Sequence, residues 1–341
     1  MRRFAVGAGA LILAVAGVSA GPASAEPGAR KPAQACEYVK LPLPEDAPVP
    51  SASQVWGADD TGRHVVGRVR HSDGYARPVL WTDGKPAWLI PDKERASSIA
   101  DSVTNDGRVV GMTQQDDGTW THWIYQAGEY VPLPEPAGLI DVRLTAINNR
   151  GDIVGYGWDS VVGDWAPIVK PAGEQWRRLP VKEGGGDVVD ISDSGVVIGR
   201  RTERGVPKAG VVWKSWTDLP LQLPAKERDH AEVLEIRGQW IAGYEITNTI
   251  WDFTGLRWTA DGVGVVSYDQ GAYSVNTSGD VATQSTNAEP GSKVVRADGS
   301  EITFPVETDL RYVFNRGGQY VAAGVLGSGA NTVAVLWTGC S

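Results

Sequence analysis

The chain repeats itself with a period of 39 to 45 residues, and this repeat restricts the folds open to it more than any other feature. Each copy holds a turn glycine followed by a short apolar strand that ends in another small residue. The seven copies begin at Gly62, Gly107, Gly151, Gly195, Gly238, Gly279 and Gly318. Units of this length are typical of arrays in which each unit buries its apolar faces only by packing against its neighbours.

Within one unit the residues predict four antiparallel strands. For the second unit we expect strands at 101–104, 108–112, 121–125 and 129–133, with a tight turn at Asn105-Asp-Gly107. No helical 3.6-residue periodicity competes with this pattern from residue 26 onward. Seven such units predict an all-β fold, namely a seven-bladed β-propeller of four-stranded antiparallel blades.

The last repeat is one strand short, and the start of the chain supplies a candidate for it. We expect only three strands there, at 311–314, 320–323 and 333–337, whereas Glu37-Tyr-Val-Lys-Leu-Pro42 closely matches Glu129-Tyr-Val-Pro-Leu-Pro134 in the second repeat. The segment 37–43 is therefore predicted to complete the last blade, which removes two exposed sheet edges. Cys36 and Cys340 then meet where the ends join, and we expect a disulfide between them.

The first residues are typical of a secretory signal. Arg2 and Arg3 precede an apolar run over 4–18, and Ala23-Ser24-Ala25 resembles a cleavage site. We therefore expect a cleaved signal peptide at 1–25, a linker at 26–36 and a single propeller domain at 37–341. The protein is predicted to be secreted and extracellular, where a disulfide persists. No later segment is apolar enough to span a membrane.

Charge argues against a nucleic-acid partner. The net charge of −9 becomes −11 once the two arginines of the signal are removed, and the basic residues are scattered among more numerous acids. Binding to a phosphate backbone needs clustered lysines and arginines. We expect a monomer that carries no cofactor.

Two copies of the repeat match a known motif. The segments Ala146-Ile-Asn-Asn-Arg-Gly-Asp-Ile-Val-Gly155 and Val103-Thr-Asn-Asp-Gly-Arg-Val-Val-Gly111 resemble the core of the HAF-type extracellular repeat family, whose repeats also carry an aliphatic-Trp pair and a terminal Leu-Pro. The resemblance covers residues 37–340. It implies a secreted β-propeller and no established set of catalytic residues. The later copies depart from the motif, since Arg237 stands before Gly238 and Thr283 replaces the second glycine.

The tryptophans fall into two groups. One group shares a single repeat position and is predicted to form wedges between blades: Trp81, Trp213, Trp258 and Trp337, with Tyr125 as the equivalent. The other group lies in or beside the predicted connections between second and third strands, accompanied by acids. These candidate ligand-binding residues are Trp120, Trp158, Trp165, Trp251, Asp116, Asp117, Asp159, Asp164 and Asp252.

Aromatic faces beside carboxylates suit sugar rings or cationic peptide segments. The alternative interpretation of the same residues is loop-packing aromatics and solvated turn acids. The four histidines show no metal-ligand spacing, and no catalytic or metal-binding residue is predicted.

The sequence therefore favours a non-enzymatic binding module that recognises an extracellular glycan or protein segment on one face. The alternative is a hydrolase or lyase that uses acidic residues at the central channel. Inward-facing acids with a cationic partner at the channel mouth would favour the enzyme. An aromatic patch would favour the binding module.

Overall fold

The computed structural model describes residues 36–48, 52–72, 74–89, 98–225, 230–247, 250–284, 291–305, 308–316, 319–327 and 332–340, without the side chains of 247, 250–252, 319 and 320. These residues belong to one compact unit. The predicted signal at 1–25 lies outside them, as does the predicted linker apart from Cys36. In the described part, no helix has the length and apolarity needed to cross a membrane.

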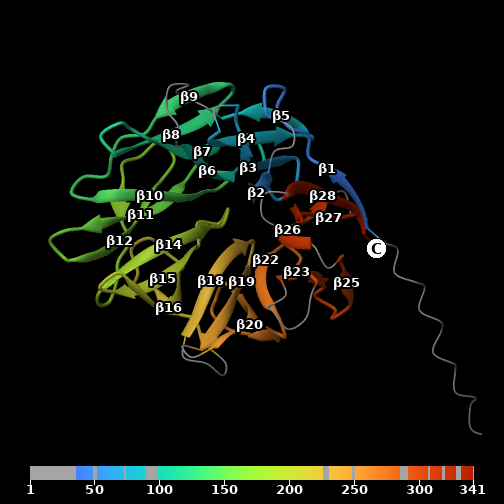
Figure 1. Ribbon diagram of the computed structural model, residues 1–341. Coiled ribbons are helices and arrows are strands. Elements are labelled where there is room, and N and C mark those ends of the chain that lie inside the picture. The colour runs from blue at the N-terminus through green and yellow to red at the C-terminus, as the bar shows by residue number, and fades with distance from the viewer. Residues whose placement is uncertain are drawn as a thin grey trace, which may run out of the picture. The chain divides into compact units, whose positions relative to one another are not determined.

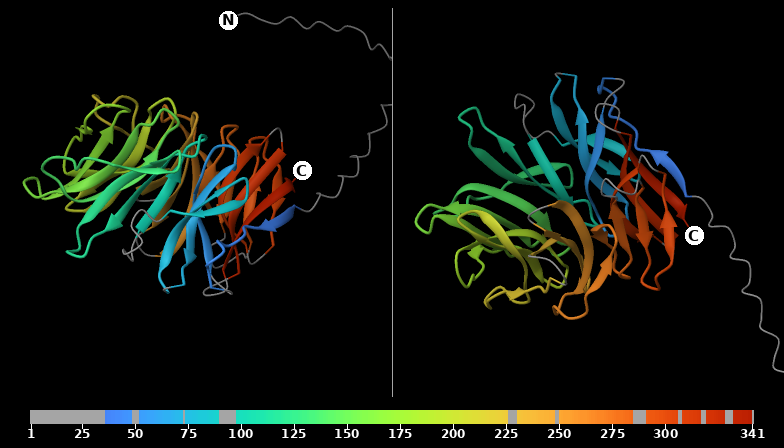
Figure 2. Two further views of the ribbon diagram at one scale, coloured as in Figure 1. Left: turned by 90° about the horizontal axis from the view of Figure 1, so that it is seen from above. Right: turned by 60° about the horizontal axis from the view of Figure 1, so that its bottom comes forward.

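The described strands pair into seven four-stranded antiparallel sheets, which are the blades of a closed propeller (Figure 1). Figure 2 shows the same blades from two further directions. The predicted fold class is confirmed.

Each blade runs from an inner first strand to an outer fourth strand. Blades 1 and 2 consist of β2 (Ser53–Ala58), β3 (His64–Arg70), β4 (Ala76–Thr82), β5 (Lys85–Trp88), and β6 (Ser98–Val103), β7 (Val109–Gln114), β8 (Trp120–Gln126), β9 (Glu129–Pro132). Blades 3 and 4 consist of β10 (Ile140–Ile147), β11 (Ile153–Asp159), β12 (Asp164–Lys170), β13 (Arg177–Arg178), and β14 (Gly185–Ile191), β15 (Val197–Glu203), β16 (Val206–Trp213), β17 (Leu221–Gln222).

Blades 5 and 6 consist of β18 (His230–Arg237), β19 (Trp240–Thr247), β20 (Ile250–Thr259), β21 (Val266–Tyr268), and β22 (Gly271–Val275), β23 (Val281–Gln284), β24 (Lys293–Val295), β25 (Glu301–Thr303). Blade 7 consists of β26 (Thr308–Arg316), β27 (Gln319–Leu326), β28 (Val333–Cys340) and the N-terminal β1 (Glu37–Lys40).

The N-terminal strand closes the ring as predicted. β1 pairs antiparallel with β28, from Glu37 opposite Thr338 to Lys40 opposite Val335, so the two ends of the colour scale lie side by side in Figure 1. Cys36 and Cys340 form a disulfide across a sequence separation of 304 residues, with their Cα atoms 4.4 Å apart. The chain-entropy model gives a loop of this length about 6 kcal/mol of stabilisation.

Strand limits differ from the sequence-based ones. The second strand of blade 2, expected at 108–112, runs over Val109–Gln114. In blade 3 the second repeat glycine, Gly155, lies opposite Leu144 of the first strand. Its equivalent in blade 7 is Gly324, opposite Leu310, six residues after the leading Gly318. The β26–β27 hairpin pairs further toward its turn than that of blade 3, through Asn315 opposite Tyr320 and Arg316 opposite Gln319. The pairing of β27 with β28 is irregular between Tyr320 and Ala322, where β28 holds one extra residue.

The tryptophan wedges explain the aliphatic-Trp and Leu-Pro elements of the repeat. In three of the four, the indole N–H donates to a proline carbonyl at the end of the preceding blade: Trp81 to Pro42 (2.7 Å), Trp213 to Pro180 (2.7 Å) and Trp258 to Pro224 (3.0 Å). The leucine before each proline is buried. A buried indole N–H needs an acceptor, and the preceding blade supplies it. The predicted core role of these tryptophans is confirmed.

The turn glycines are required by the neighbouring blade as well as by the turn. Gly151 has a φ of 91° and Gly195 a φ of 89°, which L side chains rarely adopt. A Cβ atom on Gly151 would lie 2.5 Å from the guanidinium of Arg108, and one on Gly195 would lie 2.4 Å from that of Arg150. The repeat glycine therefore allows an arginine from the preceding blade to pack on the turn.

Candidate functional site

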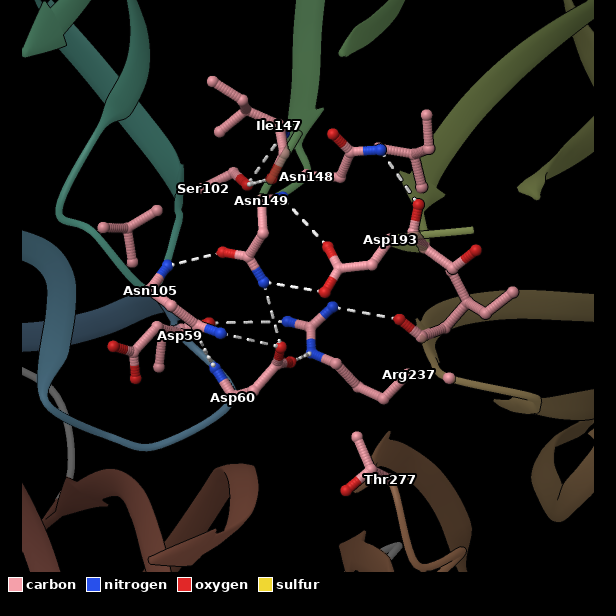
Figure 3. A pocket seen from close by; sticks show the side chains of 16 residues that line it. Asp59, Asp60, Ser102, Asn105, Ile147, Asn148, Asn149, Asp193, Arg237 and Thr277 are labelled. Atoms are coloured by element: carbon pink, nitrogen blue, oxygen red, sulfur yellow. Dashed lines mark hydrogen bonds and ion pairs between the residues drawn. The ribbon is translucent and has the colours of Figure 1, made fainter. Parts of the chain in front are cut away.

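The turns between first and second strands gather around one mouth of the central channel, on what we call the 1–2 face. They enclose a cavity of about 100 Å³ whose lining includes Asp60, Asn105, Asn149, Asp193 and Arg237 (Figure 3). These residues come from blades 1 to 5 in order around the ring. Asp60, Asn105, Asn149 and Asp193 share one repeat position, two residues before the turn glycine, whereas Arg237 stands directly before Gly238.

Asparagine and aspartate side chains link each turn to the next. The backbone N–H of Asp60 donates to Oδ1 of Asn105 (3.1 Å), and that of Asn105 to Oδ1 of Asn149 (2.7 Å). The N–H of Asn149 then donates to Oδ1 of Asp193 (2.9 Å). Asn148, the residue before Asn149, makes different contacts. Its Oδ1 accepts the N–H of Asp152 within the same turn, and its Nδ2 donates to the carbonyl of Ser192 in the next blade. The Asn-Asn pair of the repeat therefore joins blades.

Arg237 lies at the centre of this mouth, surrounded by three carboxylates. Its Nε is 3.1 Å from Asp60, its Nη1 is 3.1 Å from Asp190, and its Nη2 is 2.8 Å from Glu235. Asp60 reaches it from blade 1, Asp190 from blade 4, and Glu235 from the same strand, β18. Sequence reasoning noted Arg237 only as a departure from the repeat motif. The absence of an asparagine before Gly238 was the sequence feature that could have pointed to a special role for Arg237.

Bulges in the first strands bring two of these acids into position. The pairing of β14 shifts register between Val188 and Asp190, and that of β18 shifts between Val233 and Glu235. The residue after each bulge then reaches the next blade, because Asp190 accepts the N–H of Ile236 (3.0 Å) and Glu235 accepts that of Val275 (2.9 Å). Ser102 and Ser274 make the equivalent contacts with Ile147 (3.0 Å) and Val313 (3.2 Å).

The electrostatics of the cluster follow from its burial. Burial raises the pKa of Glu235 to about 7 against the opposing charge of Arg237. Burial likewise raises the pKa of Asp190 above its ordinary value. Burial alone would lower the pKa of Arg237, but the charges of Glu235, Asp190 and Asp60 raise it well above its usual range. The arginine is therefore a permanent cation that neutralises buried acids.

Every oxygen of the three acids already has a partner. The second oxygen of Asp60 accepts from Asn149 (3.3 Å) and Asn105 (3.4 Å), and that of Asp190 accepts the N–H of Ile191 (2.8 Å). The second oxygen of Glu235 accepts the N–H of Val275. Inward-facing acids with a cationic partner thus exist, but their bonds hold blades together. The arrangement suits structural closure of the channel mouth better than acid-base chemistry.

The opposite side of the ring, which we call the 2–3 face, carries the hairpins between second and third strands. Trp158, the last residue but one of β11, lies opposite Trp165, the second residue of β12, and the two rings meet edge to face at 5.2 Å. Both tryptophans lie on strands directly beside the hairpin connection, because β11 and β12 pair as far as Asp159 and Asp164. Both side chains are half-buried.

Asp159 and Asp164 are buried and engaged within the protein. Asp159 accepts the N–H groups of Val161 (2.9 Å) and Val162 (3.1 Å) and pairs with Arg178, a hydrogen bond that holds its pKa below the ordinary value. Asp164 accepts bonds from three residues of the next blade: Thr202 Oγ1, Arg204 N and Gly205 N. Burial opposes the ionised form of Asp164, but these hydrogen bonds lower its pKa overall. These acids hold hairpins in place.

Trp120, Trp165 and Trp158 lie in one row. Arg143 and Tyr156, which sequence analysis did not single out, connect Trp120 to the other two. Arg143 lies over the ring of Trp120, 4.7 Å from its centroid, and pairs across strands with Tyr156. The ring of Tyr156 is 5.2 Å from that of Trp165, which meets Trp158. We call Trp120, Arg143, Tyr156, Trp165 and Trp158 the aromatic row. The sequence feature that could have pointed to Tyr156 is its position directly after Gly155, the second repeat glycine.

The remaining candidates lie apart from this row or outside the described residues. Asp116 and Asp117 are exposed in the β7–β8 hairpin, where Asp117 accepts the N–H of Thr119 (2.9 Å). Trp251 and Asp252 belong to β20, but their side chains are outside the described part of the structure. Among the described residues, no group of three or more His, Cys, Asp or Glu side chains is arranged to hold a metal ion.

No protein-family model matches the sequence, and no curated protein matches it either. Solved structures do. A catalytically inactive virginiamycin B lyase from Staphylococcus aureus with quinupristin has 12% identity and a TM-score of 0.54, over 89% of this chain and 99% of that one. The β-propeller domain of the Trilobed protease from Pyrococcus furiosus has 11% identity and a TM-score of 0.57, over 84% of this chain and 94% of that one.

A third similar structure is YCF48 bound to D1 peptide, with 12% identity and a TM-score of 0.53, over 90% of this chain and 96% of that one. Likenesses at this level of identity show the fold alone. They identify no specific family, so the resemblance to HAF-type repeats stays a prediction. The chain is a seven-bladed β-propeller whose last blade is completed by its N-terminal strand.

Proposed function

We propose that this protein is a non-enzymatic binding module that holds an apolar protein segment against the 2–3 face of blades 2 to 4. The observation that carries the proposal is a set of exposed aliphatic side chains beside the aromatic row. The most exposed is Val161, at 93% of its maximum, followed by Val162 at 61% in the same hairpin tip. Large apolar side chains gathered at this density mark interaction surfaces.

The exposed set is continuous with the aromatic row. Ile140, exposed at 56%, lies opposite Trp158 in the β10–β11 pairing. Val206, exposed at 53%, follows Gly205, whose Cβ position lies within about 3.6 Å of both Trp158 and Trp165. We call Ile140, Val161, Val162 and Val206 the apolar tips. Asp164, beside the hairpin that carries Val161, accepts the N–H groups of Arg204 and Gly205 in the hairpin that carries Val206. These hydrogen bonds fix the two hairpins relative to each other.

The chemistry favours a protein segment over a glycan. Sugar rings stack on open aromatic faces, whereas the tryptophans here meet one another edge to face and Trp120 is covered by Arg143. Aliphatic tips gain most from an apolar side chain that excludes water. Arg143 adds a cation for a carboxylate on the bound segment. A glycan ligand remains the second outcome that an experiment can distinguish.

We also propose that the protein works outside the cytoplasm, as its predicted signal peptide indicates. The Cys36–Cys340 disulfide supports this, because such bonds persist mainly in oxidising compartments.

The enzyme alternative has one observation in its favour. Glu235, with a pKa of about 7 beside Asp60 and Asp190 in the channel mouth, lies in the range of a general acid or base. We place it second because the oxygens of all three acids are bonded to Arg237, to asparagine side chains or to backbone N–H groups.

The test is a binding screen of the purified protein on an immobilised peptide library and on a glycan array. We expect retention on peptides with apolar residues, lost in Val161→Asp and weakened in Trp158→Ala. Val263→Asp is the matched control, since Val263 is also an exposed valine (67%) but follows the third strand of blade 5, on the 1–2 face. Equal binding by the two aspartate variants would contradict the proposed surface. Binding to glycans only would reassign the ligand class.

A further inference from the structure

The wedge position of blade 6, at the interface with blade 5, lacks the tryptophan found in blades 1, 4, 5 and 7; the same position is Tyr125 in blade 2 and Lys170 in blade 3. Strand pairing sets Val65 opposite Trp81 in blade 1, Val197 opposite Trp213 in blade 4 and Ile241 opposite Trp258 in blade 5. In blade 6 the same position, opposite Val281, is Val295. Val295 is half-buried, whereas the tryptophans are fully buried. A valine is much smaller than an indole, so the interface is left underfilled at this point.

A second departure faces the first across the same interface. The residue before the wedge is aliphatic in six blades: Leu80, Ile124, Val169, Val212, Val294 and Leu336. In blade 5 it is Arg257, which is only 7% exposed. Its Nη1 donates to the carbonyl of Gly279, and its Cζ lies 4.7 Å from the ring centroid of Trp240. Its Nε is shielded from solvent and has no hydrogen-bond partner among the described residues.

These two departures border one cavity of about 300 Å³, lined among others by Arg257, Tyr268, Thr283, Lys293 and Val295. Its polar side chains are mostly held in place. Thr283, which replaces the second repeat glycine, donates to Gln270 (3.1 Å), and Lys293 pairs with Glu301 at 3.4 Å. A cavity half this size already admits a single aromatic ring in other proteins. Two guanidinium groups border this space, those of Arg257 and Arg296, and that of Arg257 is the one that replaces an aliphatic residue of the other blades.

We propose that this cavity binds a small aromatic carboxylate. The ring takes the space that a tryptophan fills in blades 1, 4, 5 and 7, between Val295 and Tyr268. The carboxylate lies against the guanidinium group of Arg257 and pairs with its positive charge. Charge-assisted bonds from a guanidinium to a carboxylate are short and strong, and they are strongest where water is excluded. The site is separate from the aromatic row, which belongs to blades 2 and 3.

The first experiment uses the unmodified protein and a series of probes, followed by calorimetric titration. Benzoate and indole-3-carboxylate are compared with benzamide, which keeps the ring and loses the charge, and with acetate, which keeps the charge and loses the ring. We expect both aromatic carboxylates to bind at least about tenfold more tightly than either control, because one good hydrogen bond changes an affinity by about this factor. Failure of both aromatic carboxylates to bind at millimolar concentration, or equal binding by acetate, would overturn the proposal.

Two variants then locate the binding. Val295→Trp restores the wedge of the other blades and should abolish binding while leaving the melting temperature unchanged or raised. Arg257→Leu restores the usual aliphatic residue and should remove the preference for carboxylate over benzamide. Val161→Asp, in the apolar tips, should bind the probes normally, which keeps this site distinct from the proposed function. Unchanged affinity in a folded Val295→Trp variant would place the probe elsewhere and refute the site.

Discussion

The indole N–H of Trp81 donates a 2.7 Å hydrogen bond to the carbonyl of Pro42, which joins the first blade to the strand that the N-terminus adds to the last. Trp213 and Trp258 repeat this contact with Pro180 and Pro224. Trp337 shares their position, but its Nε1 is buried without a hydrogen-bond partner among the described residues. One repeat position therefore offers both a bonded and an unbonded indole.

This pair gives the first prediction. Trp81→Phe removes the indole hydrogen bond and leaves the Pro42 carbonyl unsatisfied, whereas Trp337→Phe removes an N–H that already lacks an acceptor. Both changes leave a similar small void. We expect Trp81→Phe to lower the free energy of unfolding by about 1 kcal/mol more than Trp337→Phe does. Urea denaturation of the two variants measures the difference. Equal losses would show that the indole bonds contribute nothing beyond packing.

The disulfide gives the second prediction. The double variant Cys36→Ser/Cys340→Ser should lose up to about 6 kcal/mol of unfolding free energy, because the unfolded chain is no longer a closed loop. Reductant should destabilise the unmodified protein by a similar amount and leave the double variant unaffected. A melting temperature that is insensitive to reductant in both would contradict the role given to Cys36 and Cys340.

The third prediction concerns Arg237. Arg237→Leu leaves Asp60, Asp190 and Glu235 in the channel mouth without their cation, and we expect a loss of about 3–5 kcal/mol. The matched control is Arg63→Leu, since Arg63 pairs with Asp83 (3.1 Å) on the exposed surface and should cost less than about 1 kcal/mol. A loss for Arg237→Leu no greater than that for the control would mean that the cluster does not stabilise the ring.

The fourth prediction is a pH dependence at Asp101. Burial raises the pKa of this carboxyl to about 6 against the opposing charge of Arg68, and its Oδ1 has no hydrogen-bond partner among the described residues. Because the folded state holds the proton more tightly than the unfolded state does, Asp101 should cost stability as the pH rises from about 4 to about 6. Above that window the cost is constant, at up to about 3 kcal/mol.

Asp101→Thr is the variant that tests it, because Thr145 occupies the same bulge position in blade 3. We expect the variant to be more stable than the unmodified protein at pH 8, with the two curves converging toward pH 4. Melting temperatures measured across this range provide the check. Parallel curves for the two proteins would rule out titration of Asp101 in that window.

Sequence alone determined the architecture. The spacing of the turn glycines predicted the number of blades, and the match of Glu37–Pro42 to Glu129–Pro134 predicted which strand closes the ring. It also paired Cys36 with Cys340. These features were readable because each depends on local strand and turn chemistry repeated along the chain, so that one copy confirms another.

Only the tertiary structure decided what individual residues do. Asp60 and Arg237 meet across the channel mouth from blades 1 and 5, and Trp120 is joined to Tyr156 by an arginine of the next blade. Nor could the sequence show that Val295 and Arg257 face the same cavity, since that depends on the register of two sheets. Such contacts depend on how closed sheets curve and pack, and no local pattern records which side chains from distant repeats share one space.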